Sequence, residues 1–338
     1  MKKWIARLAL LLVAVFVIAA LSAWLLLRAS LPELDGERAL AGLGSPVTIE
    51  RDALGVVTVK AESLVDLARA TGFVHAQERY FQMDLLRRSA AGEVAALVGA
   101  AAVDYDIARR RHQLRAVAGE VLANLSAAEH RWLMAYAEGA NAGLDALGAC
   151  PFEYGLLRVS PEPWRAEDSI LVIFAMYFDL HDEDARRERF LAALHAHFPV
   201  AFVDFLVPAG TEWDAPLVGD RLGTEEIPGP EVVDFRNQTV RDLQDGSSEA
   251  FSPGSNNWAV DGRRSHSGSA IVANDMHLGL GVPNTWFRTR FEVSGENGFT
   301  ATGVSLPGVP AIVVGSNGRI AWGFTNSYGD WTDLRSEE

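Results

Sequence analysis

Cysteine is almost absent from this sequence of 338 residues, because Cys150 is the only one. A single cysteine cannot form an intramolecular disulfide, and no cluster of other ligands surrounds it in the sequence to suggest a thiolate metal site. We therefore expect Cys150 to be a small buried hydrophobic residue.

Basic residues are also scarce relative to acids, with 30 Lys and Arg against 44 Asp and Glu and a formal net charge of −14. This balance disfavours a nucleic-acid partner, which would need a basic surface. The sequence contains neither the Gly-x-Ser-x-Gly elbow of common serine hydrolases nor the His-Glu-x-x-His helix of metalloproteases. These two hydrolase classes are therefore disfavoured.

The first 30 residues combine basic and apolar segments. Lys2, Lys3 and Arg7 precede an apolar run from Leu8 to Leu27, which is the pattern of an export signal. The run is also long enough to span a bilayer, and no clean Ala-x-Ala site follows it. We expect residues 1–30 to be either a removed signal or a retained anchor, with the protein periplasmic or held on the outer side of the cytoplasmic membrane.

The rest of the chain changes its pattern twice. Residues 31–222 begin with a predicted hairpin, 46–50 and 56–59, and continue with helical periodicity. The predicted helices are Ser63 to Val98, Ile107 to Leu122, Ala127 to Leu147 and Ala166 to Ala196. Residues 223–254 are acidic and rich in Pro, Gly and Ser, which is typical of a linker. In residues 255–338 strand patterns return, so the sequence predicts an α+β protein. Its hydrophobic content of 49% indicates a sizeable core.

The predicted strands after the linker are 258–260, 270–273, Phe287 to Val293, Phe299 to Val304, Ala311 to Val314 and Ile320 to Thr325. The dipeptide Asn317-Gly318 is a strong hairpin turn between the last two. The first two strands would form a hairpin that brings His277 back towards Ser255.

Ser255 follows Gly254 at the end of the linker, directly before the first of these strands. Taken alone, Gly-Ser-Asn-Asn is most often a turn. In a self-cleaving precursor, however, Ser255 would become a new N-terminus, and its α-amine, with a pKa of about 7.7–8.0, could accept the proton of its own hydroxyl. Gly254 relaxes the backbone at the bond that this hydroxyl would attack.

Several ordered motifs resemble the penicillin acylase family of N-terminal nucleophile hydrolases. The matching segments are 51–56, 72–79, 82–88, 92–93, Ser255 to Trp258, Asn274 to Leu278, 306–308 and 315–323. The resemblance implies a four-layer αββα sandwich, which we expect to be incomplete in this chain, with a helical first part and the first strands of the second. It also implies two chains, α and β, cut from one precursor with a spacer peptide removed. It implies hydrolysis of a small-molecule amide through an acyl-enzyme on Ser255, without an organic cofactor.

The resemblance also assigns roles to individual positions. Asn326 aligns with a backbone N–H donor to the oxyanion, and His277 with a residue that supports the nucleophile, although a lone histidine is more often structural. Four apolar positions map to the acyl pocket, which favours an aromatic or aliphatic acyl group: Phe174, Phe178, Leu278 and Val314. Phenylalanines four residues apart on a helix are equally typical of an ordinary core.

A structural calcium ion is implied by the same resemblance. Asp330, Thr332 and Asp333 align with its ligands near the end of the sequence. Asp184 is the best-aligned acid from the first half, and a shift of the alignment makes Glu183 and Glu188 the alternatives. Oxygen ligands suit Ca²⁺. For Asp184 a solvated acidic helix face is an equally good interpretation.

The family's second oxyanion donor, an Asn side chain, and a positioning Arg would lie beyond residue 338. We therefore expect this chain to be the N-terminal portion of a longer precursor or a truncated product. The alternative function is a membrane-tethered, non-catalytic remnant of the acylase fold that binds a ligand or partner. Cleavage before Ser255 discriminates between the two functions.

Overall fold

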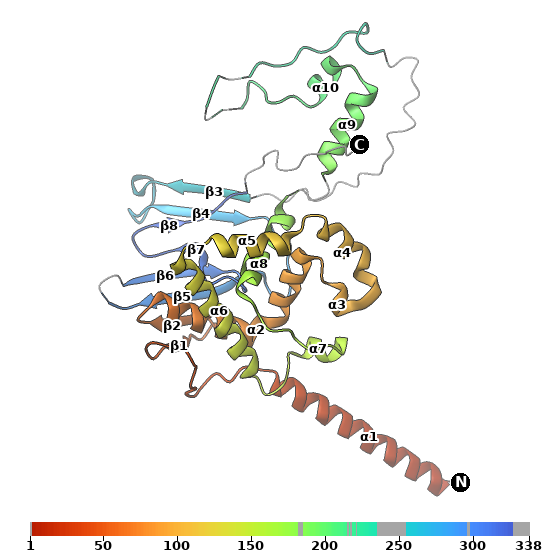
Figure 1. The fold of residues 1–338 in the computed structure, drawn as a ribbon, viewed down its shortest axis with the longest axis vertical. Helices are drawn as coiled ribbons and strands as arrows, with labels where there is room; N and C mark the ends of the chain where they lie inside the picture. Colours follow the sequence, from red (N-terminus) through yellow and green to blue (C-terminus); the bar gives the residue numbers. More distant parts are fainter. Residues whose placement is uncertain are drawn as a thin grey trace. The chain divides into compact units, whose positions relative to one another are not determined.

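The computed structural model describes residues 2–181, 185–214, 216, 218–220, 222–234, 255–295 and 298–326 (Figure 1). The chain divides into two compact units. One unit comprises Met1–Asp179 and Gly254–Asn326, and the other comprises Leu180–Pro253 and Ser327–Glu338. Strands and helices are both abundant in the first unit, which confirms the α+β class. The expected segment boundaries at residues 30, 222 and 254 stay predictions.

The N-terminal helix α1 (Lys2–Ala29) is long, apolar and exposed. An 18-residue window within its segment Lys3–Ala29 has a mean hydropathy of 2.9 with none of it buried, so by length and composition the helix can cross a membrane. The backbone N–H of Ala149 donates to the carbonyl of Ala29 over 3.0 Å. The neighbouring Cys150 is exposed, so the expectation of a buried cysteine was wrong. Its position after a helix end, in a surface connection, explains the exposure.

Helices make up most of the described chain between residues 64 and 206. Their bounds in the first unit are α2 (Leu64–Ala91), α3 (Ala95–Val98), the 3₁₀ turn η1 (Gly99–Ala102), α4 (Val103–Arg110), α5 (Leu114–Asn124), α6 (Ala127–Asp145), α7 (Phe152–Leu157) and α8 (Ala166–Leu180). The predicted helix 63–98 is interrupted because α2 ends at Gly92, whose φ of 68° and N–H bond to the Arg88 carbonyl form a left-handed cap.

Helices α2 and α6 cross at very short distance. A Cβ atom built on Gly139 of α6 would overlap the carbonyl oxygen of Arg69, and one built on Gly72 of α2 would overlap that of Tyr136. Side chains at these two positions would therefore push the helices apart. The crossing lies within a core cluster that includes Ala68, Ala76 and Tyr136.

A mixed sheet of six strands packs against this helical layer. Its order is β1-β2-β5-β6-β7-β8, and all neighbours are antiparallel except β2 and β5. The strands are β1 (Thr48–Arg51), β2 (Val57–Ala61), β5 (Phe287–Val293), β6 (Phe299–Ser305), β7 (Ile312–Ser316) and β8 (Ala321–Trp322). Val59 pairs with Phe291 in the parallel register, so the sheet contains segments from both sides of Ser255.

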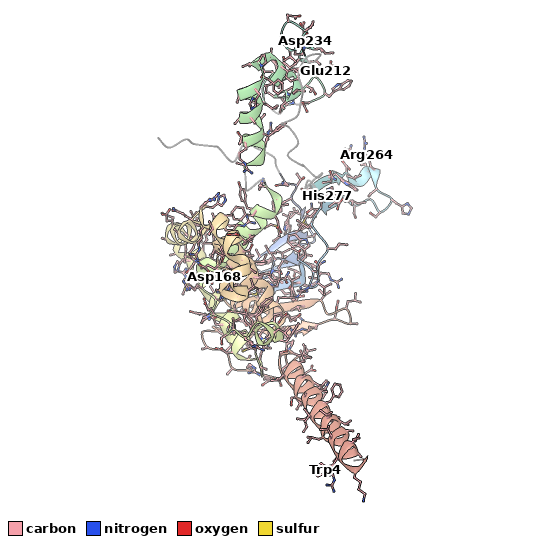
Figure 2. All side chains as sticks on the ribbon, turned by 90° about the vertical axis from the view of Figure 1, so that its right-hand side faces the viewer. Trp4, Asp168, Glu212, Asp234, Arg264 and His277 are labelled. Atoms are coloured by element: carbon pink, nitrogen blue, oxygen red, sulfur yellow. The ribbon has the colours of Figure 1, made fainter. Side chains whose placement is uncertain are left out.

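A buried charge network joins α2, α5 and α8. The Asp84 carboxylate accepts hydrogen bonds from the Arg87 and Arg88 guanidinium groups at 2.7 and 2.9 Å, and from the Tyr154 hydroxyl at 2.7 Å. The carboxylate of Asp168, marked in Figure 2, accepts from Arg87 at 2.5 Å. Arg115 donates to the same carboxylate at 2.6 Å. Both carboxylates are fully buried and satisfied, as a buried charge must be to avoid a large desolvation cost.

His75 ties α2 to the sheet through a chain of hydrogen bonds. The Gly308 N–H donates to the Tyr136 hydroxyl at 2.9 Å, and that hydroxyl lies 2.9 Å from His75 Nδ1. On the other side His75 Nε2 lies 3.0 Å from Ser305 Oγ, which donates to the Phe287 carbonyl. With the Ser305 proton used in this way, Nε2 carries the imidazole proton and Nδ1 accepts. Every donor in the chain therefore has an acceptor.

The described part of the second unit includes two short helices, α9 (Arg186–His197) and α10 (Val200–Leu206). Phe198 and Phe202 place their ring centroids 5.1 Å apart in this unit. The single helix expected from Ala166 to Ala196 was wrong, because α8 ends at Leu180 and α9 follows Ala185, whose φ is 49°. A left-handed residue at that point is incompatible with a continuous α-helix.

Candidate active site

The candidate site is built on a two-stranded hairpin. Strand β3 (Ser255–Val260) pairs antiparallel with β4 (Ile271–Met276), and Ser255 lies opposite Met276. The connection contains the 3₁₀ turn η3 (Gly262–Arg264), capped by the Asp261 carboxylate, which accepts from the Arg263 N–H at 2.9 Å. The hairpin predicted between residues 258 and 273 is confirmed, and its register returns the chain to Ser255.

Ser255 contacts the segment that follows β8. The Asn326 N–H donates to Ser255 Oγ, and the Thr325 Oγ1 atom lies 3.0 Å from the same oxygen. Thr325 Oγ1 also donates to the Ser255 carbonyl at 2.8 Å. Two consecutive residues therefore hold the hydroxyl and the carbonyl of one serine.

These contacts fix the direction of each proton. Thr325 has one hydroxyl proton, which is used at the Ser255 carbonyl, so Ser255 Oγ donates to Thr325 Oγ1 and accepts from Asn326. In the uncut chain the Ser255 nitrogen is an amide and cannot act as a base. The backbone N–H of Asn326, which we expect to bind an oxyanion, thus already contacts the Ser255 hydroxyl oxygen.

His277 lies one residue beyond the end of β4, where Figure 2 labels it. Its Nε2 atom is 3.3 Å from Asn256 Nδ2 and 3.1 Å from Asp275 Oδ2. The imidazole therefore contacts the residue next to Ser255 and a carboxylate. Its expected supporting role at Ser255 stays a prediction.

Asn274 connects the hairpin to the segment after β8. Its Nδ2 donates to the carbonyls of Asn256 at 3.2 Å and Phe324 at 2.8 Å, and its Oδ1 accepts from the Phe324 N–H at 3.2 Å. A Cβ atom on Gly323 would lie 2.8 Å from the Asn274 Cβ. Sequence reasoning gave no role to Asn274 or Thr325; the signals available were the Asn-Asp-x-His motif and the Gly-x-Thr sequence after Trp322.

The four positions expected to line an acyl pocket lie on two elements, α8 and β7, and one turn. Phe174 packs against the buried cluster around Leu171. The Cζ atom of Arg109 lies over the Phe178 ring, 4.2 Å from the ring centroid. Leu278 follows His277, in a turn where its N–H donates to the Met276 carbonyl. Val314 pairs with Val304 in the sheet. Both phenylalanines thus make core contacts, and the pocket assignment stays a prediction.

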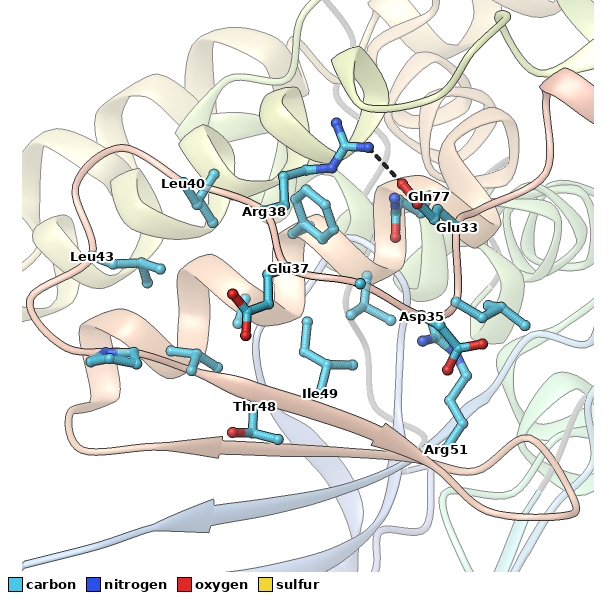
Figure 3. A pocket seen from close by; sticks show the side chains of 17 residues that line it. Glu33, Asp35, Glu37, Arg38, Leu40, Leu43, Thr48, Ile49, Arg51 and Gln77 are labelled. Atoms are coloured by element: carbon cyan, nitrogen blue, oxygen red, sulfur yellow. Dashed lines mark hydrogen bonds and ion pairs between the residues drawn. The ribbon is translucent and has the colours of Figure 1, made fainter.

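A cavity of about 650 Å³ lies at the opposite edge of the sheet, beside β1 (Figure 3). Residues 33–38 form one wall, where Arg38 pairs with Glu33 at 3.0 Å, and α2 residues such as Phe73 form another. None of the four expected acyl-pocket residues lines it. The Ser255 site contacts residues just beyond β8, so this cavity belongs to a different part of the sheet.

Comparison with known proteins identifies the family of this chain. The penicillin amidase family model matches residues 46–338. The chain belongs to the penicillin amidase family. Penicillin acylase 2 proenzyme of Pseudomonas sp. (strain SE83) is 34% identical over 322 residues, covering 92% of this chain and 40% of that protein.

Two further comparisons give the extent of the likeness. Acyl-homoserine lactone acylase QuiP of Pseudomonas aeruginosa is 34% identical over 321 residues, covering 91% of this chain and 36% of that protein. The solved thermostable penicillin G acylase from Alcaligenes faecalis superposes with a TM-score of 0.44 and 29% identity, covering 52% of this chain and 98% of that one. The chain spans about two fifths of the length of these curated relatives.

Within the penicillin amidase family the calcium prediction concerns residues that the structure does not describe. Asp184, Glu183, Asp330, Thr332 and Asp333 lie outside the described residues, as does Gly254 at the expected cleavage point. Glu188 is described, in the first turn of α9. Among the described residues no group of three or more His, Cys, Asp or Glu side chains could hold a metal ion. The calcium site therefore stays a prediction.

Proposed function

We propose that this chain is part of an amidohydrolase that cuts its own backbone before Ser255 and then hydrolyses a linear amide with an apolar acyl group. The observation that carries the proposal is the position of Ser255. It begins β3 at the end of the acidic linker, and its hydroxyl accepts the backbone N–H of Asn326. Family membership and a relative named as a proenzyme support the same conclusion.

The proposed reaction uses the two groups of an N-terminal serine, its α-amine and its hydroxyl. After scission the Ser255 amine, with a reference pKa of about 7.7–8.0, is partly neutral near pH 7 and takes the hydroxyl proton directly or through water. The oxygen attacks the amide carbonyl, the amine product leaves with a proton, and water hydrolyses the resulting ester to the carboxylic acid. His277, whose Nε2 atom lies beside Asp275 and Asn256, supports the position of the Ser255 hydroxyl or amine.

Asn326 changes partner during this reaction. Once Ser255 Oγ bonds to the carbonyl carbon, that oxygen becomes a weaker acceptor, and the Asn326 N–H turns to the oxyanion that forms beside it. A preorganised donor of this kind contributes about 2.7–4 kcal/mol to transition-state stabilisation.

The substrate class follows from the apolar positions and from the relatives. Phe174, Phe178, Leu278 and Val314 carry no charge with which to bind an ionised acyl tail. The relatives are named for penicillin and acyl-homoserine lactones, and both compounds hold an acyl group in an amide linkage. We include in the proposal the four-layer αββα sandwich, a Ca²⁺ clip through Asp330, Thr332, Asp333 and Asp184, and a location outside the cytoplasm directed by α1.

The test is the N-terminus of the mature protein. Purified protein should contain a fragment that begins with Ser255, and Ser255→Ala should leave the backbone intact and abolish release of amine and acid from phenylacetyl and medium-chain acyl amides. Ser267→Ala, in the exposed turn of the same hairpin, is the matched control and should behave like the unaltered protein.

An unbroken backbone without turnover would instead support the non-catalytic remnant. Turnover in Ser255→Ala, or mature ends elsewhere in an active protein, would refute the proposal outright.

A further inference from the structure

Asn274 holds two backbone segments together at the candidate site. One carboxamide nitrogen reaches the carbonyls of Asn256 and Phe324, and the carboxamide oxygen reaches the Phe324 N–H. The pair of bonds to Phe324 repeats the exchange of N–H and C=O that two antiparallel residues make. We propose that Asn274 is a positioning residue that sets the register of segment 323–326 against the nucleophile.

The backbone at this point needs such a partner. Strand β8 ends at Trp322, so the ladder with β7 no longer supports the residues that follow. The Asn274 side chain supplies the hydrogen bonds that a neighbouring strand would otherwise make to Phe324. Gly323 makes this possible, because a Cβ atom there would lie 2.8 Å from the Asn274 Cβ and 2.9 Å from its Oδ1.

The register set at Phe324 determines the contacts of the next two residues. Thr325 bonds the Ser255 carbonyl and hydroxyl, and Asn326 bonds the hydroxyl. On the other side of the carboxamide, Asn256 is the residue after Ser255. Asn274 therefore fixes the nucleophile and its N–H donor relative to each other from a single side chain.

Asn274 is itself held by the hairpin, where it pairs with Asn257. It makes no hydrogen bond to Ser255 in this structure, so its effect passes through Phe324 and Asn256. The inference rests on the proposed nucleophilic role of Ser255, and it adds a residue that sets the geometry of the N–H donor.

The sharpest variant is Asn274→Asp. The carboxylate keeps the shape and the acceptor for the Phe324 N–H, but it replaces the donor that faces two carbonyl oxygens with a third oxygen. Asn257→Asp is the matched control, because it places the same charge on the adjacent strand at an exposed position.

The assay follows backbone scission in cell-free translation, where the chain starts uncut, and then steady-state turnover of an acyl amide. Asn274→Asp should slow scission at least 10-fold and lower kcat at least 10-fold while KM changes less than 3-fold. In Asn257→Asp the scission rate, kcat and KM should each stay within 2-fold of the values for the unaltered protein. A purely structural residue would lower the amount of folded protein without this split between kcat and KM.

A second variant reaches the same contact from the other side, so that misfolding of one variant does not leave the inference untested. Gly323→Ala should displace Asn274 and give the same pattern, whereas Gly279→Ala, where a Cβ meets open space, should not. Wild-type scission and kcat in both Asn274→Asp and Gly323→Ala would overturn the inference. Loss of scission in Ser255→Ala alone, with these variants active, would refute the role of Asn274 and leave the proposed function standing.

Discussion

His75 makes the folded protein sensitive to acid. Burial, together with the charge of Arg79, lowers the pKa of His75 to about 3 from an ordinary value of 6.5. The folded state keeps the imidazole neutral between the Tyr136 hydroxyl and Ser305 Oγ. Protonation would place a charge in the core and require Nδ1 to donate towards a hydroxyl whose proton already points at it.

The sign of the effect follows from proton binding in the two states. Below pH 6.5 the unfolded chain binds a proton at His75 that the folded chain does not bind, so the free energy of unfolding falls as the pH falls. The contribution is fully present above pH 6.5 and is lost progressively towards pH 3. A pH of 5 lies 1.5 units below the ordinary pKa of 6.5, and each unit corresponds to about 1.4 kcal/mol. The free energy of unfolding therefore falls by about 2 kcal/mol at pH 5.

The assay is urea denaturation of the protein at pH 7 and pH 5 in a non-ionic detergent, because α1 is apolar and exposed. The comparison protein is His75→Gln, which cannot titrate. Between the two pH values the unaltered protein should lose about 2 kcal/mol more unfolding free energy than the variant, whatever their absolute stabilities. A difference below about 0.5 kcal/mol would refute the assignment of a neutral, fully bonded His75.

Two further changes test other contacts. Thr325→Val removes both hydrogen bonds to Ser255 and should slow scission about 10-fold, corresponding to about 1.4 kcal/mol, whereas Thr325→Ser keeps the hydroxyl and should cut within 2-fold of the natural rate; equal rates on gels would contradict the contact. Gly139→Ala should destabilise the protein by about 3 kcal/mol because its Cβ overlaps the Arg69 carbonyl, whereas Gly119→Ala in α5, with open space, should stabilise it by about 0.5–1 kcal/mol. Thermal unfolding measures both, and shifts of the same sign would argue against the tight helix crossing.

Local patterns predicted the local elements well. Strand 287–293 has the predicted bounds, and the turn at Asn317-Gly318 closes with the Asn317 N–H donating to the Ile320 carbonyl. The hairpin predicted from strands 258–260 and 270–273 is also present, and its ladder extends further, to Ser255 and Met276. In each case neighbouring residues in the sequence supply most of the interactions that decide the structure.

Contacts between distant residues were not predictable in this way. Asp84, Arg87 and Asp168 are charged residues that would be expected on the surface, and they are buried because they satisfy one another across α2 and α8. The parallel pairing of β2 with β5 joins strands more than 200 residues apart. At the site, the hairpin could be predicted, but the contacts of Asn274 and Thr325 depend on where the segment after β8 lies.

The placement of β2 beside β5 bears on the order of maturation. If the backbone were severed before Ser255 while the two strands were still apart, assembly would become an encounter between two separate polypeptides and would depend on their concentration. A tether that survives until Val59 and Phe291 are in register keeps that search intramolecular. Once the sheet has closed, the proposed cut would no longer separate the two parts, because the ladder between β2 and β5 would hold both products together.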